Sequence, residues 1–438
     1  MNYQAEYTGK RIAMNNLMGL LRPSDRILCY GGAATFLTEL DEHYEELLDV
    51  EIYTMFLLTK PYNFLTDKTQ GHIRHYATFV SDPVREILKA GGAPEIILTH
   101  YSDTDNFVRH RARPTVLLVE VTPMDEEGYF TMGFNSLGHM AAVEMADRVV
   151  VQVNRNMPRI NGDCNKLHIS NVTAVVEHDA VLYARPSAHV FEEVDVKAAS
   201  FVAERIPDGA TLQIGVGRVP DAVGVLLDGH RHLGVHTEMF SQSLMDLMKK
   251  GIIDNSVKTL LPGKSVFSFA GGARATQEIY DFMDGNPDVE MHPISWVNDP
   301  RVIAKCDNFV SINSALAVDL TGQVCSETIG LRTFSGTGGQ LDFVRGAKWA
   351  KGGKSYIIIN SVVEKSDGTC ISKISCALPN GSAVTVPRAD VDCIVTEYGI
   401  AELRYKSLSE RAKALISIAH PDFRDELTFK AKQAGYFV

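Results

Sequence analysis

The 438-residue chain is predicted to fold as two similar open α/β domains with largely parallel sheets and a ligand site in the cleft between them. Its length exceeds that of one ordinary domain, which favours two. Short apolar runs alternate with helical patterns along the chain, which is typical of parallel sheets covered by helices on both faces. A segment near the start is also echoed in the second half, which indicates a duplicated unit.

Seven apolar runs predict the strands of these sheets. They are Thr115–Val121, Arg148–Val153, Ala174–Val176, Thr211–Ile214, Phe309–Ile312, Ser355–Ile359 and Cys393–Val395. A polar stretch from Tyr183 to Asp195 precedes a helix predicted at Val196–Arg205. The division is therefore expected there, with a first domain at 1–186 and a second at 187–438.

Two internal echoes support the duplication. Arg22-Pro-Ser-Asp-Arg-Ile-Leu-Cys-Tyr-Gly-Gly32 parallels the segment from Ile206 to Val216, and aligning Pro23 with Pro207 places Gly31 on Gly215. Each copy predicts a turn, a short strand, a glycine loop and a helix. The second internal similarity is between Ala146–Asn154 and Lys305–Asn313. Each of these segments predicts an apolar strand that ends in Asn.

Composition narrows the function. Hydrophobic residues make up 45% and charged residues 22%, as in a globular protein, while the net charge of −11 argues against a broad nucleic-acid surface. No apolar run has the length of a membrane span, and the first residues lack an export pattern. Seven cysteines without a Cys-x-x-Cys pair predict reduced, buried thiols in a cytoplasmic protein. The histidines show no metal-binding spacing, so no metal and no prosthetic group is expected.

The stretch from Asp208 to Phe240 carries the strongest local pattern. A buried strand at 210–214 leads into Gly215 and Gly217, and Pro220 suits the first position of the following helix. A second apolar run at 233–236 ends close to an acid, Glu238. The order is thus strand, glycine turn, helix, strand, glutamate.

Local pattern leaves three interpretations of this stretch open. One is a dinucleotide fold, in which an acid about 20 residues after a glycine turn holds a ribose. Another makes Glu238 a nucleophile beside a turn that binds an oxyanion. The third is a buried βαβ unit whose acid caps the next helix or is solvated. Pro220 occupies the third glycine position of the dinucleotide pattern, which weakens the first interpretation.

Longer motifs add a specific resemblance. Gly215-Val-Gly-Arg-Val-Pro-Asp-Ala-Val223 and Leu233-Gly-Val-His-Thr-Glu-Met239 are followed by Phe334-Ser-Gly-Thr-Gly-Gly-Gln-Leu-Asp-Phe-Val-Arg-Gly346. Val395–Leu403, Ala412–Phe423, Val153–Pro158 and His168–Ser170 also match. Together these segments resemble the acetyl-CoA hydrolase/transferase family, in its 4-hydroxybutyrate and butyryl-CoA:acetate CoA-transferase branch. The resemblance covers nearly the whole chain and is looser between about residues 30 and 115.

The resemblance implies transfer of CoA from a short-chain acyl-CoA to a carboxylate, with Glu238 forming first a mixed anhydride and then a glutamyl-CoA thioester. Desolvation would activate this carboxylate, and fixed N–H donors would stabilise the tetrahedral oxyanions. The resemblance assigns oxyanion and CoA contacts to two groups of residues. They are Gln213, Ile214, Gly215, Val216, Gly217 and Asn313, and, in the second turn, Gly336, Gly338 and Gly339.

Several assignments stay open. The basic run of Arg345, Lys348, Lys351 and Lys354 is either a solvated face or a phosphate contact, and His236 either packs or acts as a base. The preferred acid is undecided among acetate, propionate, butyrate and 4-hydroxybutyrate. An acyl-CoA hydrolase using the same glutamate, a nicotinamide-dependent dehydrogenase and a sugar-phosphate sensor are the alternatives. Acyl-CoA is expected as a substrate, no cofactor as permanently bound, and the protein as a homodimer or homotetramer.

Overall fold

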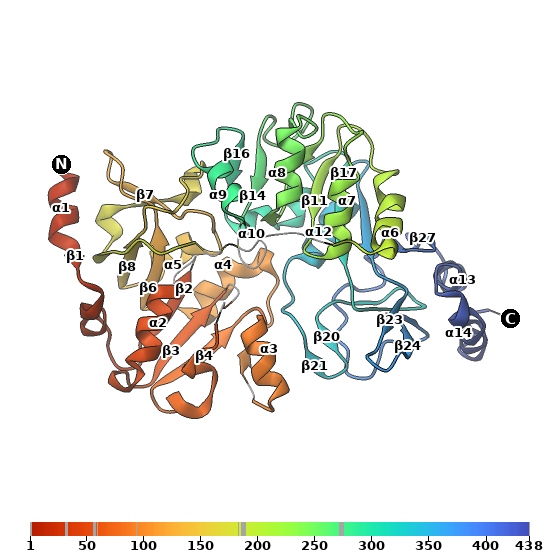
Figure 1. Ribbon diagram of the computed structural model, residues 1–438, viewed down its shortest axis with the longest axis horizontal. Coiled ribbons are helices and arrows are strands. Elements are labelled where there is room, and N and C mark those ends of the chain that lie inside the picture. Colours follow the sequence, from red (N-terminus) through yellow and green to blue (C-terminus); the bar gives the residue numbers. More distant parts are fainter. Residues whose placement is uncertain are drawn as a thin grey trace. The chain divides into compact units, whose positions relative to one another are not determined.

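The computed structural model describes residues 2–30, 34–55, 58, 60–92, 94–182, 184, 190–270 and 276–437, apart from the side chain of Asp163. The chain forms two compact units (Figure 1). The first comprises Met1–Ser187, Phe240–Gln242 and Val266–Val297, and the second comprises Ala188–Met239, Ser243–Ser265 and Asn298–Val438. The predicted division between residues 186 and 187 lies outside the described residues. Two segments that the prediction gave to the second domain, 240–242 and 266–297, belong to the first unit.

The first unit is built on an eight-stranded sheet whose described pairings are all parallel. Its order is β1 (Arg11–Ile12), β10 (Ala174–Glu177), β8 (Arg148–Val153), β6 (Val116–Val121), β2 (Arg26–Tyr30), β3 (Val50–Thr54), β4 (Ile73–Ala77) and β5 (Glu95–Ile96). Every residue of β6 and β8 is buried, because central parallel strands are covered on both faces. Ile27, Ile52 and Leu118 lie in the resulting core.

Helices and small sheets complete the first unit. The helices are α1 (Tyr3–Lys10), α2 (Ala34–Glu42), α3 (Asp82–Lys89), α4 (Thr104–Phe107), α5 (His139–Met145), α9 (Gln277–Met283) and α10 (Ile294–Val297). Strand β7 (Tyr129–Thr131) pairs with β9 (Lys166–His168), and β14 (Ser265–Phe267) pairs with β16 (Val289–Met291). Strand β13 (Met239–Phe240) pairs with β15 (Phe269–Ala270).

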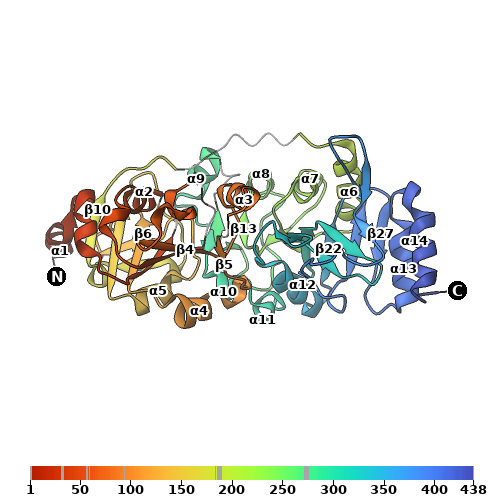
Figure 2. The same ribbon diagram turned by 90° about the horizontal axis from the view of Figure 1, so that it is seen from below.

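The second unit is built on a six-stranded sheet. Its order is β12 (Gly234–Val235), β11 (Thr211–Ile214), β17 (Phe309–Ser314), β22 (Lys354–Ile358), β26 (Cys393–Thr396) and β27 (Gly399–Glu402). Strand β27 runs antiparallel to β26, and the other pairings are parallel. Figure 2 shows α13 (Leu408–Ser417) and α14 (Pro421–Gln433) together at the β27 edge of this sheet.

The remaining elements of the second unit surround this sheet. Its other helices are α6 (Glu193–Ala203), α7 (Arg218–Val225), α8 (Gln242–Lys249), α11 (Pro300–Ile303) and α12 (Gln340–Trp349). A small three-stranded sheet has the order β19 (Val324–Cys325), β18 (Ala317–Asp319) and β25 (Ile374–Ser375). In addition, β20 (Thr328–Ile329) pairs with β21 (Arg332–Thr333), and β23 (Val362–Glu364) pairs with β24 (Cys370–Ser372). Ile357, Ile394 and Leu415 lie in the core of this unit.

The predicted fold class is confirmed, and each of the seven predicted strands forms within a residue or two of its expected bounds. Two local expectations are wrong. Pro220 is the third residue of α7, which begins at Arg218; its missing N–H is harmless there because N–H groups of a first helical turn have no intrahelical partner. None of the seven cysteines, all of which are described, forms a disulfide, but Cys164 and Cys370 are exposed rather than buried.

The structure supports one of the two echoes. Strands β2 and β11, which follow Pro23 and Pro207, each lie between two parallel neighbours, β3 and β6 in one sheet and β12 and β17 in the other. The other similarity compares β8, which precedes Asn154, with β17, which contains Asn313. Strand β17 neighbours β11, but β8 does not neighbour β2, so the two strands occupy different positions in their sheets. Gly31, the counterpart of Gly215, lies outside the described residues.

Candidate active site

Glu238 lies beyond the carboxyl end of β12, in the second unit. Strand β12 runs parallel to β11, with Leu212 opposite Val235, and the His236 N–H donates to the Leu212 carbonyl at 3.1 Å. Because both strands point the same way, Glu238 and the glycine turn after β11 follow the same edge of the sheet. Glu238 precedes α8 by four residues and is therefore not the N-cap of that helix.

The carboxylate of Glu238 is held from two sides. The amide nitrogen Nδ2 of Asn298 donates to its Oε2 at 2.8 Å, and among the described residues this is its one hydrogen-bond donor. The backbone of Gly339, the N-cap of α12, lies directly against both groups, so a Cβ at position 339 would overlap Glu238 Oε2 and Asn298 Nδ2. A helix N-terminus favours negative charge nearby, which makes this a suitable place for a carboxylate.

Glu238 is partly exposed, yet protein atoms surround most of its side chain. Desolvation raises the pKa of its carboxyl to about 7; the hydrogen bond from Asn298 opposes this rise, and the charge of Asp342 in the first turn of α12 adds to it. A poorly solvated carboxylate is a stronger nucleophile than a hydrated one, because less water must be removed before it attacks.

The first glycine turn is fixed by a buried amide cluster. Ser311 Oγ donates to Gln213 Oε1 at 2.7 Å, and Asn313 Nδ2 donates to the same oxygen at 3.1 Å. The Gly215 N–H donates to the Ile312 carbonyl at 2.8 Å, and a Cβ there would stand 2.6 Å from Asn313 Oδ1. Only glycine fits this close approach between two strands.

The residues that complete this turn differ in exposure. Ile214 ends β11 and is buried, whereas Val216 is half exposed. Gly217 has a φ of +155° and is the N-cap of α7, and Ser314 Oγ donates to the Val216 carbonyl at 3.4 Å. Gln213, Gly215 and Asn313 thus form one group of neighbours, while Glu238 and Gly339 form another.

The second glycine turn is anchored by a buried acid. Glu327 accepts hydrogen bonds from Thr337 at 3.1 Å and Thr385 at 2.9 Å, and its carbonyl accepts the Phe334 N–H at 2.7 Å. Gly338 has a φ of +61°, which favours glycine. Gly336 is buried on this turn beside Ser335, whereas Gly339 contacts Glu238.

Two open assignments now have a structural answer. The basic run is engaged in ion pairs, Arg345 and Lys348 with Asp390, Lys351 with Asp307, and Lys354 with Asp392. This favours a solvated face over a phosphate contact. The imidazole of His236 is fully buried and meets the Phe309 ring edge-on, with centroids 6.2 Å apart, as expected of a packed histidine.

Asn298 and Lys373 lie in none of the quoted motifs, whereas Asp342 lies in the one from Phe334 to Gly346. Asn298 and Asp342 reach Glu238 only through the tertiary fold, 60 and 104 residues away along the chain. Lys373 lines a cavity of about 200 Å³ beside Gly217, together with Arg218, Ser314 and Asn360. A lone lysine or asparagine gives no sequence signal, because its role depends on which distant groups surround it.

No metal-binding group of three or more histidine, cysteine or acidic side chains is found in the described ranges. In the part of the chain that the structure describes, no helix is long and apolar enough to cross a membrane.

Comparison with known proteins identifies the class of protein that this fold and site define. Residues 1–184 match the acetyl-CoA hydrolase/transferase N-terminal domain, and residues 275–431 match the C-terminal domain of the same name. The chain belongs to the acetyl-CoA hydrolase/transferase family.

Two curated relatives and one solved structure span nearly the whole chain. It is 38% identical to the 4-hydroxybutyrate coenzyme A transferase of Clostridium kluyveri, over 99% of this chain and 100% of that one. It is 35% identical to the butyryl-CoA:acetate CoA-transferase of Anaerostipes caccae, over 99% and 98%. The crystal structure of RipA from Yersinia pestis superposes with a TM-score of 0.91 at 33% identity and covers both chains completely. The acetyl-CoA hydrolase of Saccharomyces cerevisiae is more distant, at 25% identity over 73% of this chain and 66% of the other.

Proposed function

We propose that the protein is a CoA-transferase that exchanges CoA between a short-chain acyl-CoA and a carboxylate of the acetate, butyrate or 4-hydroxybutyrate class. The observation that carries this proposal is the carboxylate of Glu238, which is poorly solvated, bonded by Asn298 and placed against Gly339, the N-cap of α12. A carboxylate in such a setting suits nucleophilic attack better than structural capping.

The reaction proceeds by two exchanges on Glu238. Its carboxylate attacks the acyl carbonyl and expels CoA thiolate, which leaves a mixed anhydride. The thiolate then attacks the glutamyl carbonyl, which releases the first carboxylate and leaves a glutamyl-CoA thioester. An acceptor carboxylate attacks that thioester and expels CoA thiolate, which leaves a second mixed anhydride. The thiolate then attacks the acyl carbon that came from the acceptor, so that a new acyl-CoA and the free carboxylate of Glu238 are formed.

Each attack places negative charge on a tetrahedral oxygen. Asn298 supplies an N–H donor to Glu238, and the N-terminus of α12 lies beside it, where negative charge on the tetrahedral glutamyl oxygen would develop. We assign the glycine turn at Gly215–Gly217, with Gln213, Ile214, Val216 and Asn313, to CoA binding, and the turn at Gly336–Gly339 to the thioester.

The relatives support transfer over hydrolysis. Those at 35–38% identity over the full chain are named CoA-transferases, whereas the relatives named hydrolases are about 25% identical over a smaller part of the chain. We infer that acyl-CoA is a substrate rather than a resident cofactor. Cytoplasmic location and a homo-oligomeric state stay predictions.

Covalent capture tests the nucleophile. Incubation with acetyl-CoA without an acceptor should raise the intact mass by one CoA less one water, located on the peptide that contains Glu238. The Glu238→Gln variant should bind acetyl-CoA and show no capture, whereas Glu364→Gln, at an exposed acid on β23, should retain it. Capture on any other peptide contradicts the assignment.

A second assay separates transfer from hydrolysis. Loss of acetyl-CoA is followed with and without butyrate, and the products are identified by mass. A transferase yields butyryl-CoA only when butyrate is present. Free CoA released at the same rate without butyrate identifies a hydrolase instead.

A further inference from the structure

One face of the second unit gathers exposed aromatic and cationic side chains. Trp349, at the end of α12, is 56% exposed, and Tyr405, between β27 and α13, is 89% exposed. Arg404 joins them, because its guanidinium donates to the Lys348 carbonyl and lies over the Tyr405 ring, 5.4 Å from the centroid. Leu408, the first residue of α13, is also exposed. Large exposed side chains gathered in this way are typical of a surface that contacts another molecule.

The backbone presents Tyr405 in an unfavourable conformation. Its φ of +61° lies in the left-handed region, which a residue with a bulky side chain rarely adopts. Such a conformation persists only where the surrounding structure imposes it, and it is often found where a side chain is held for a function. Burial of the Tyr405 ring against a partner would offset this cost.

Positive charge borders these aromatic side chains. Five cations share three acidic partners in ion pairs, and they are Arg345, Lys348, Lys351, Lys354 and Arg404, with Asp307, Asp390 and Asp392. Lys406 is exposed and makes no ion pair with any described residue. The exposed acids nearby, Glu402 and Glu410, leave the cations in excess. We call this surface the basic face, and it comprises Trp349, Lys351, Arg404, Tyr405, Lys406 and Leu408.

The first unit carries a surface of the opposite charge. Between residues 39 and 51 the chain has seven acids and no lysine or arginine. Glu42, Glu45 and Glu46 are exposed there, and Leu48, which follows them, is 59% exposed. We call these four residues the acidic face. It has an apolar side chain beside charged ones, as the basic face does, but its charge is negative.

We propose that the basic face docks on the acidic face of a second copy of this chain. Trp349 and Tyr405 then cover Leu48 of the other copy, while Lys406 meets its glutamates. Tryptophan, tyrosine and arginine are the residues that most often dominate the binding energy of an interface, and opposite charges around them select the correct surface. Every copy carries both faces, so a two-fold axis repeats the contact reciprocally and closes the assembly at two copies.

Removal of the exposed ring tests the basic face. Asparagine tolerates the left-handed conformation, so Tyr405→Asn should not lower the melting temperature at concentrations where the protein is monomeric. Its dissociation constant for self-association, measured by sedimentation velocity over a range of concentrations, should rise at least about 30-fold, as for the loss of a dominant interface residue. Trp349→Ala should act in the same direction.

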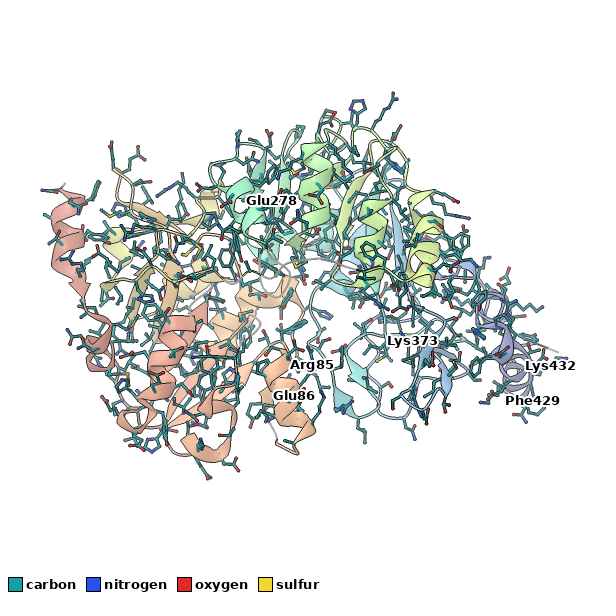
Figure 3. The ribbon with its side chains drawn as sticks, in the orientation of Figure 1. Arg85, Glu86, Glu278, Lys373, Phe429 and Lys432 are labelled. Carbon is teal, nitrogen blue, oxygen red and sulfur yellow. The ribbon has the colours of Figure 1, made fainter. Side chains whose placement is uncertain are left out.

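Charge reversal tests the occupant. Lys406→Glu and Glu45→Lys should each raise the dissociation constant about 3- to 10-fold, because each places like charges across the contact. Both changes in one chain should recover part of the affinity, since the two faces then again carry opposite charges at these positions. Lys432→Glu, at an exposed lysine that Figure 3 shows on α14, makes the same charge change outside both faces and should associate as the unmodified protein.

Three results would overturn the proposal. A chain that sediments as a monomer at every concentration lacks the contact, even if its basic face binds another polyanion such as heparin. Self-association that Tyr405→Asn leaves unchanged uses a different surface. A loss with Tyr405→Asn but not with Glu45→Lys shows that the basic face does not meet the acidic face. These measurements need no substrate, so they stand whether or not CoA transfer is found.

Discussion

The two sheets place different chemistry at one topological position. In the first unit Cys29 lies opposite Leu118, and in the second Gln213 lies opposite Ser311. The repeat aligns Cys29 with Gln213, so their partners Leu118 on β6 and Ser311 on β17 also correspond. Two residues further along these strands lie Glu120 and Asn313, which therefore occupy equivalent positions. The first unit therefore buries an acid where the second buries an amide.

Glu120 resembles Glu238 in acidity and differs from it in access. Burial raises the pKa of Glu120 to about 7, opposed by a hydrogen bond from Asn154. Glu120 is only 1% exposed, and its Oε1 accepts from Asn154 at 2.6 Å and Gln152 at 3.3 Å. The same two amides hold the carbonyls of His178 and Ala180, beyond the end of β10.

This difference shows that a raised pKa alone does not identify a nucleophile. Glu238 keeps an exposed edge and has one donor, whereas Glu120 is enclosed and has two. We assign reactivity to the first and a structural role to the second, and each prediction below tests that division.

The largest expected effect is that of Glu238→Gln. Removal of a covalent nucleophile lowers turnover by about 10³-fold or more, so transfer between acetyl-CoA and butyrate should nearly vanish while the melting temperature is not lowered. The matched change Glu120→Gln should leave transfer within a few-fold. Equal losses in both variants would abolish the distinction between the two acids.

Gly339→Ala should have the next largest effect. A Cβ there overlaps Glu238 Oε2 and Asn298 Nδ2, so the carboxylate must move, and a displacement of about 1 Å can lower the rate about 10²-fold. Steady-state kinetics on acetyl-CoA measures the loss. Gly229→Ala serves as control, because a Cβ at Gly229 meets no atom within 4 Å. Unchanged kcat in Gly339→Ala would contradict the placement of Glu238.

Asn298→Ala should change the pH dependence. In the proposed mechanism the ionised form of Glu238 attacks, so kcat/KM should rise with pH through about 7 in the unmodified protein. Loss of the Asn298 hydrogen bond removes the interaction that lowers this pKa, so the rise should move to higher pH and activity at pH 6 should fall about 10-fold. If kcat/KM rises at the same pH in both proteins, Glu238 is not the group whose ionisation controls activity.

The smallest effect on activity is expected for Glu120→Gln, which should act on stability. The pKa of the folded carboxyl is about 7, against 4.5 for an ordinary glutamate, so the stability of the unmodified protein should fall as pH rises between these values. The shift corresponds to about 3 kcal/mol. Urea unfolding at pH 5 and pH 8 should show Glu120→Gln losing less stability than the unmodified protein. Equal slopes would mean that Glu120 is ionised in the fold.

Sequence predicts the strands better than it predicts the groups around Glu238. Apolar runs such as Arg148–Val153 identify buried parallel strands because burial on both faces leaves few alternatives. The short strand β27 and its antiparallel direction were not predicted, since a brief strand after a turn lacks a long apolar run. Asn298 and Lys373 were missed because neither lies in a motif, and their neighbours are distant along the chain.

The crowding of Gly339 against Glu238 also governs when the site appears during folding. Glu238 and Asn298 are separated by 60 residues, and Gly339 lies further on, so the reactive arrangement exists only after α12 has joined the sheet. Before that step Glu238 is a hydrated carboxylate with ordinary acidity and low nucleophilicity. We therefore expect the unfolded chain to resist acylation by acetyl-CoA, and covalent labelling with acetyl-CoA to count only the molecules that have completed the fold.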